Sequence, residues 1–221
     1  MFNGYRHKLL REGHLKHKRQ NTDNSAIYSA TITAGSLLIH ESRNTSSLLI
    51  SGLSRQDIKK KVIEENLFQS RSQGASERHC RLILDRLTLI NPGILPMISE
   101  GDYVLSTQAL LACAIKHSRL LGDFMLNVIG PKIRIIDDKL TNRDWERFLE
   151  TCEQLDPHVK EFTESTRKKL KQIIFRILVE AKYLESQKTK RLTPVRIEPE
   201  LKSFLIKHEE KYVLNCLEVG K

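Results

Sequence analysis

The chain has 221 residues and a formal net charge of +10. With 39% hydrophobic and 29% charged residues, it holds enough apolar side chains to offset the entropy of chain ordering, which excludes an intrinsically disordered protein. Aromatic residues make up 6%, too few for a protein that stacks single-stranded bases on an aromatic surface. The longest apolar runs fall far short of the roughly 20 residues of a membrane-spanning helix. We therefore expect a cytoplasmic protein without membrane contact.

The positive charge lies in two stretches. Residues 1–20 hold six basic residues against Glu12 alone, a net charge of +5, and residues 157–191 hold ten basic against four acidic residues, a net charge of +6. The other residues together carry −1. One basic stretch would indicate a solvated surface or tail. Two stretches around a neutral body favour a polyanion-binding protein, because each Lys or Arg that neutralises a phosphate releases condensed counterions.

The first quarter of the chain predicts a basic arm and then two helices. We assign residues 1–25 to the arm and expect a helix from about Thr33. Ser54 and Asp57 match a capping box, in which a hydroxyl and a carboxylate satisfy backbone N–H groups at a helix start. Apolar residues then recur at helical spacing, so the sequence predicts a helix to about Asn66.

The next predicted helix spans about 76–90 and ends before Pro92, because proline disfavours helical backbone in the preceding residue. Together with helix 54–66 it has the order of a helix-turn-helix motif, whose second helix enters the major groove. The connection over 67–74 is longer than the turn of that motif, which usually has about three or four residues. An antiparallel helix pair in any bundle gives the same pattern, so both interpretations stay open for this first helical domain, residues 26–100.

A second helical domain is predicted over residues 101–221. We place Ser106 as the N-cap of its first helix and the Gly-Pro pair at 130–131 as that helix's end. Thr141 and Asp144 match another capping box and predict a helix after them.

The most regular apolar stripe predicts a helix from about Ser165 to Leu184. A polar, basic turn and a short extended segment follow it, which is the arrangement of a winged helix with its wing at 183–197. The competing interpretation is a simple connection to helices at 199–208 and 211–217. The predicted fold class is mostly α: two small helical domains with helix-turn-helix or winged-helix-like features and at most a short β-hairpin.

Motifs of catalysis and metal binding are not found in the sequence. It lacks a phosphate-binding GxxxxGK loop, a GxGxxG turn, an HExxH helix and a GxSxG elbow, and its four cysteines form no CxxC pair. Adjacent residues on a helix point about 100° apart. The acidic pairs Glu64-Glu65 and Asp137-Asp138 are therefore better explained as solvated surface residues than as ligands of one shared metal ion. We predict no enzymatic activity, no cofactor and no metal.

The predicted contacts to nucleic acid are therefore cationic side chains that bind phosphates. If about six phosphates are neutralised, log affinity should fall with log salt at a slope near −5. Asn and Gln recognise a base through two hydrogen bonds at once. They are not clustered in this chain, so its preference for particular DNA sequences should be weak. The residues are Arg6, Lys8, Arg11, Lys16, Lys18 and Arg19 in the arm; Arg71, Arg78 and Arg81 near the helix at 76–90; and Lys168, Lys169, Lys171, Lys188, Lys190 and Arg191 in the basic helix and turn.

An ordered set of short motifs lies between residues 28 and 130. The set comprises Tyr28-Ser-Ala-Thr-Ile-Thr-Ala-Gly35, Leu37-Leu-Ile-His-Glu41, Glu65-Asn-Leu-Phe-Gln-Ser-Arg71, Arg78, Arg86-Leu87, Leu110-Leu-Ala112 through Lys116, Arg119-Leu120 and Asp123-Phe124. With these motifs the chain resembles the BrxA family of bacterial BREX phage-defence systems.

The resemblance implies a small, soluble, helical DNA-binding component without catalysis, encoded beside a methyltransferase, a helicase-like protein and an ATPase. From the placement of the charge we predict that the DNA it binds is double-stranded. Other BREX proteins are then expected as partners. Members of the family have also been compared with the NusB antitermination fold, which implies an RNA-binding factor as an alternative. A second alternative is a protein-protein adaptor in the defence complex, with the charge serving solubility alone.

Overall fold

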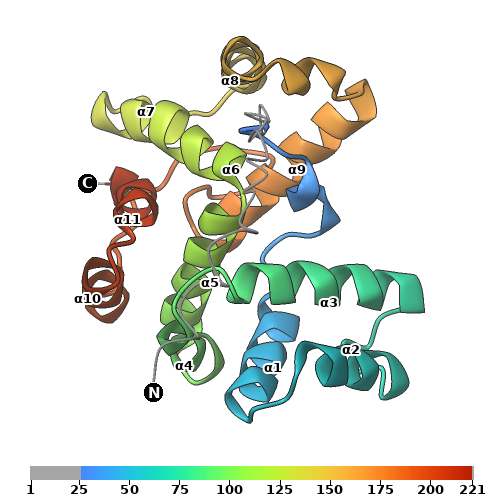
Figure 1. Cartoon of the computed structure of the whole chain (residues 1–221). Coiled ribbons are helices and arrows are strands. Elements are labelled where there is room, and N and C mark those ends of the chain that lie inside the picture. The colour runs from blue at the N-terminus through green and yellow to red at the C-terminus, as the bar shows by residue number, and fades with distance from the viewer. Residues whose placement is uncertain (1–25, 221) are drawn as a thin grey trace, which may run out of the picture.

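Residues 26–220 are described by a computed structural model, and apart from two isolated β-bridges their regular structure is helical (Figure 1). The mostly α fold class is therefore confirmed. The helices are α1 (Ile39–Ile50), α2 (Arg55–Glu64), α3 (Gln73–Leu87), α4 (Leu95–Ser99), α5 (Tyr103–His117), α6 (Arg119–Phe124), α7 (Gly130–Arg134), α8 (Asn142–Leu155), α9 (Glu164–Glu180), α10 (Pro199–Lys207) and α11 (Lys211–Leu217). Short 3-10 turns cover Thr31–Ala34, Pro92–Ile94, Pro157–Glu161 and Glu218–Gly220, and a π turn, Met125–Ile129, joins α6 to α7.

Serine caps fix the starts of α2 and α3. Ser54 Oγ accepts a hydrogen bond at 3.1 Å from the backbone N–H three residues later, and Ser72 Oγ does the same at 3.3 Å. These bonds satisfy N–H groups that have no partner within the helix. The helix predicted over 54–66 is confirmed, and the one predicted over 76–90 is present as α3 with both ends about three residues earlier.

The helix expected from Thr33 begins later. Thr31–Ala34 forms a single 3-10 turn, and α1 starts only at Ile39. Leu38 has a φ of 52°, in the left-handed region that interrupts a right-handed helix.

Two boundaries predicted in the second half are wrong. Asp102 caps α5 in place of Ser106, its Oδ1 accepting the Leu105 N–H at 2.8 Å. Ser106 lies buried inside the helix and donates its hydroxyl to the Ile98 carbonyl at 2.8 Å. The helical backbone also continues past the Gly-Pro pair at 130–131, because the wider π turn places this pair in the first turn of α7.

The capping box before α8 is confirmed. Asp144 Oδ2 accepts the Thr141 N–H at 2.7 Å, and Thr141 Oγ1 accepts the Asp144 N–H at 3.2 Å.

The predicted basic helix is α9, capped by Thr163 and ending four residues before Leu184. The chain then folds back, and an isolated antiparallel bridge joins Leu184 to Leu192. A second bridge pairs Arg191 with Lys139, in the segment before α8. The candidate wing at 183–197 is thus a short loop whose returning arm packs beside the start of α8, and its function as a wing stays a prediction.

Buried apolar side chains from both halves of the chain form one cluster, extending from Tyr28 to Val219. Every residue of α5 from Ser106 to Ile115 is buried, as expected of a helix surrounded by other helices. The proposed domain boundary near residue 100 lies within this shared core, and the two-domain division stays a prediction.

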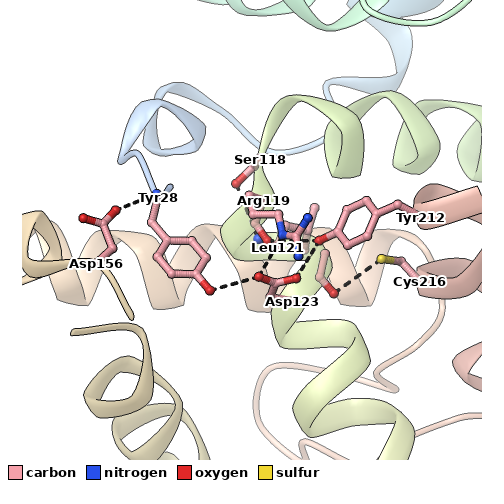
Figure 2. Close-up of polar contacts among 9 residues, drawn as sticks. Tyr28, Ser118, Arg119, Leu121, Asp123, Asp156, Tyr212 and Cys216 are labelled. Atoms are coloured by element: carbon pink, nitrogen blue, oxygen red, sulfur yellow. Dashed lines mark hydrogen bonds and ion pairs between the residues drawn. The ribbon is translucent and has the colours of Figure 1, made fainter. Parts of the chain in front are cut away.

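A buried carboxylate on α6 joins the two ends of the described chain (Figure 2). Asp123, with a side chain 8% exposed, accepts hydrogen bonds from Tyr28 Oη at 2.9 Å, Tyr212 Oη at 2.8 Å and Arg119 Nε at 2.9 Å. The Arg119 guanidinium also lies 4.3 Å from the centre of the Tyr212 ring, at cation–π distance. Burial raises the pKa of both tyrosines, and the bonds to the carboxylate raise it further, so the phenols stay protonated donors.

Close packing against Gly122 completes this network. A side chain here would place its Cβ 2.2 Å from the Tyr212 hydroxyl oxygen, so only glycine leaves room for the bond to Asp123. The Tyr28 N–H meanwhile donates to Asp156 Oδ2 at 2.9 Å. The first described residues after the basic arm are therefore held against α6 and the end of α8.

A second polar cluster fixes residues 35–37 between α3 and α9 (Figure 1). Arg86 on α3 is buried and donates to the carbonyls of Gly35, at 3.1 Å, and Ser36. Glu180, near the end of α9, accepts the Ser36 hydroxyl at 2.8 Å and the Leu37 N–H at 2.9 Å. Burial lowers the pKa of Arg86 to about 10, and its two carbonyl partners satisfy donors that would otherwise be buried alone.

Replacing Tyr28 or Tyr212 by Phe removes one donor to the buried Asp123 carboxylate. Because hydrogen bonds to charged groups contribute about 1.5–3 kcal/mol, each change should lower the free energy of unfolding by that amount in urea denaturation. The control is Tyr103→Phe, whose side chain is 55% exposed, with an expected change within about 0.5 kcal/mol. Equal stability of all three variants would contradict the network's role.

Arg86→Lys keeps the charge but loses the planar fork that reaches two carbonyls at once. We expect a loss of about 1–3 kcal/mol, since a buried carbonyl is left without a donor. Arg78→Lys, at an exposed position of the same helix, is the matched control and should be neutral in the same thermal or urea unfolding experiment.

Candidate nucleic-acid interface

The predicted binding residues divide into three sets in the structure. Arg6, Lys8, Arg11, Lys16, Lys18 and Arg19 lie outside the described residues. The α3 patch consists of Arg71, just before α3, and of Arg78 and Arg81, within it; all three are exposed. The remaining six predicted residues lie on α9 and in the loop after it.

Cations of the loop after α9 meet cations of α9 itself. Burial lowers the pKa of Lys171, and the charge of the neighbouring Lys190 lowers it further, against an opposing effect of Glu146. Lys190 Nζ also donates to Asn142 Oδ1, at the first residue of α8, at 2.7 Å. Two ammonium groups are therefore held close together beside the start of another helix.

Backbone hydrogen bonds pin this loop to the segment before α8. The Leu140 N–H donates to the Lys190 carbonyl at 2.9 Å, and the Leu192 N–H donates to the Asp138 carbonyl at 2.6 Å. Arg191 Nε pairs with Asp138 Oδ2 at 3.1 Å. These bonds bring segments about 50 residues apart into one surface.

One cation that sequence reasoning missed joins this surface. Lys139 pairs its backbone with Arg191, and its side chain is exposed. Along the sequence its charge is offset by neighbouring aspartates, which the structure pairs with Lys132 and Arg191. We call the combined set the turn patch: Lys139, Lys171, Lys188, Lys190 and Arg191.

Lys168 and Lys169 lie one turn away from the turn patch, in a more acidic setting. Lys168 Nζ pairs with Glu164 at 2.6 Å, and Lys169 Nζ donates to Gln172 Oε1 at 3.3 Å. Lys168 also borders a cavity of about 340 Å³ between α8 and α9, which three glutamates line and which Lys171 of the turn patch borders as well. Binding of DNA by Lys168 and Lys169 stays a prediction, and the turn patch supports DNA binding more strongly.

No ion pair or hydrogen bond joins the side chains of the α3 patch to those of the turn patch within residues 26–220. The Thr31–Ala34 turn packs against both α3 and α9, and the segment around it runs between these helices in Figure 1. Lys59 of α2 lines a small hollow with Arg81 and Glu77 and adds a further cation near the α3 patch.

Among residues 26–220 no group of three His, Cys, Asp or Glu side chains is arranged as metal ligands. No single helix there has the length and hydropathy of a membrane span, although α3 and Pro92–Ser99 meet that test as a pair bent by 113°. The four cysteines are buried and free.

Comparisons with known proteins match nearly the whole described chain. The model of the family described as BrxA matches residues 26–209. The chain is 38% identical to a BREX protein BrxA of Paramagnetospirillum magneticum, covering 87% of this chain and 97% of that protein. It is 33% identical to a BREX protein BrxA of Bacillus cereus, covering 75% and 82%.

A solved structure supports the same relationship. It is the crystal structure of an uncharacterised protein from Magnetospirillum magneticum, 36% identical, with a TM-score of 0.80 over 87% of this chain and 98% of that one. Sequence and fold agree over the same length, and the chain belongs to the BrxA family.

Proposed function

We propose that this protein is a non-catalytic, double-stranded DNA-binding component of a BREX phage-defence system, acting in the cytoplasm and binding chiefly through phosphates. Membership in the BrxA family makes it a BREX component. The observation that carries the rest is the turn patch, where cations from three separate segments lie on one surface.

The electrostatics of the turn patch favour a polyanion. Burial lowers the pKa of Lys171, and repulsion by the charge of Lys190 in the free protein lowers it further. A phosphate bound between them removes this repulsion and releases counterions. Arg191 is held by Asp138 with its guanidinium still two-thirds exposed, so it can reach a second phosphate.

The surface suits a duplex better than a single strand. Binding of single strands relies on exposed aromatic rings that stack on bases. Among the large exposed apolar side chains of residues 26–220, Tyr103 is the only aromatic one, and it lies at the start of α5, outside the turn patch. Backbone contacts by lysine and arginine remain, which suit the regular phosphate spacing of double-stranded DNA.

An adaptor role has one observation in its favour. Exposed Tyr103 and Val104 border a shallow apolar hollow together with Val195 and the end of α9. Another BREX protein could dock on such an area while DNA occupies the turn patch, so the two roles are compatible.

Lys188→Ala/Lys190→Ala should weaken duplex binding and lower the magnitude of the salt slope by about two, since each lost phosphate contact removes about 0.9. The matched control is Lys207→Ala/Lys211→Ala, which removes the same charge from exposed positions on α10 and α11. Fluorescence anisotropy across a salt series measures the duplex affinity and the salt slope of each variant. Equal slopes for the two variants would contradict a role for the turn patch.

Deletion of residues 1–20 removes a net charge of +5. If the arm contacts DNA, the deletion should lower duplex affinity by about tenfold or more at moderate salt, because several phosphate contacts disappear together. Unchanged duplex affinity would favour the adaptor. Circular dichroism of the shortened protein checks that its helical body still folds.

A further inference from the structure

Two isoleucines at the end of α7 are the most exposed large apolar side chains among those of residues 26–220. Ile135 is 73% exposed and Ile136 is 89% exposed. We call them the apolar tip. An isolated exposed apolar residue is common on protein surfaces, but here two adjacent residues project from one loop.

The backbone of the apolar tip is as unusual as its exposure. The Ile136 N–H donates to the Ile133 carbonyl at 3.2 Å and the Asp137 N–H to the Lys132 carbonyl at 3.0 Å, the bonding pattern of a Schellman motif. Ile136 occupies the left-handed position of that motif, with φ of 61°, where glycine is usual. A β-branched residue there strains the backbone and buries nothing in return, so folding alone does not account for it.

The loop that carries the tip is firmly held. Lys132 Nζ pairs with Asp137 at 2.6 Å and Asp144 at 3.3 Å, and it donates to the Lys139 carbonyl at 3.1 Å. The next residues are bonded to the turn patch through Asp138, whose carbonyl accepts the Leu192 N–H and whose carboxylate pairs with Arg191. The apolar tip is therefore presented at a fixed place beside the cations of the turn patch.

We propose that Ile135 and Ile136 form a wedge that inserts between base pairs of duplex DNA from the minor groove, while the turn patch holds the flanking phosphates. This inference rests on the proposed function. Apolar wedges, isoleucine among them, unstack a base step and kink DNA by about 20–90° in minor-groove binders. The two aspartates beside the tip do not oppose it, since Lys132 pairs with Asp137 and Arg191 with Asp138.

The surroundings of the apolar tip indicate that it contacts DNA rather than a protein partner. Stable protein interfaces bury about 800 Å² on each side, with a core depleted of charge. The tip offers two apolar side chains between Arg134 and the charged residues 137–139. A base step presents a small apolar surface flanked by phosphates, and the tip with its neighbouring cations matches that pattern.

Ile136→Gly and Ile135→Ala/Ile136→Gly test the wedge without threatening the fold, because glycine suits the left-handed position. Their denaturation midpoints should equal or exceed that of the wild type. Leu155→Ala removes another exposed apolar side chain, 60% exposed, and serves as the control. Anisotropy measures duplex affinity, and ligase-driven ring closure of duplexes shorter than the persistence length of about 150 bp measures bending.

We expect the wild type and Leu155→Ala to speed ring closure by about tenfold or more, and both tip variants to lose this effect while retaining salt-dependent duplex binding. Duplex binding by the wild type without faster ring closure would overturn the wedge and leave the proposed function standing. Faster ring closure that persists in the tip variants would overturn the wedge as well.

Absence of duplex binding by the wild type, read from anisotropy alone, would overturn both the wedge and the proposed function. Loss of binding to another BREX protein in the tip variants, with ring closure unchanged, would assign the tip to a protein contact instead.

Discussion

A buried carboxylate needs hydrogen-bond donors close by, and the donors to Asp123 come from three parts of the chain. Tyr28 comes from the first described segment, Arg119 from α6 itself and Tyr212 from α11. Loss of any of these bonds leaves charge buried with fewer partners, which is costly. The network therefore ties both ends of the described chain to its centre, and the bond from Tyr28 fixes where the basic arm meets the helical body.

The residues that suggested the family are those that hold this body together. Tyr28, Gly35, Arg86, Arg119 and Asp123 all belong to the two buried polar clusters, and all but Arg119, which bonds to Asp123 within one helical turn, bond across a long separation in sequence. Their geometry explains why these residue types stand at these positions: a forked guanidinium for two carbonyls, and phenols for a carboxylate. The proposed DNA surface lies elsewhere, on side chains that need only charge and exposure to contact phosphates.

Local signals in the sequence predicted more of the fold than of the site. The capping box of Thr141 depends on two residues three apart, and its prediction is confirmed. At Ser54 the serine cap forms, while no bond from the Ser54 N–H to the Asp57 carboxylate completes the predicted box. Ser106 failed as a cap because tertiary packing gives its hydroxyl to a distant carbonyl. Lys139 was missed because its place beside Arg191 depends on a loop that returns across about 50 residues. No signal in the sequence predicts the exposure of Ile136, since only the backbone conformation shows that its side chain points outward.

We propose that clustered cations on this helical body bind the phosphates of duplex DNA. A mobility shift across a salt series, with duplex DNA and RNA probes of the same length and base order, tests this proposal. We expect tighter binding to DNA at every salt concentration and a slope of log affinity against log salt near −5. Tighter binding to RNA, or an affinity for DNA that does not change with salt, would contradict it.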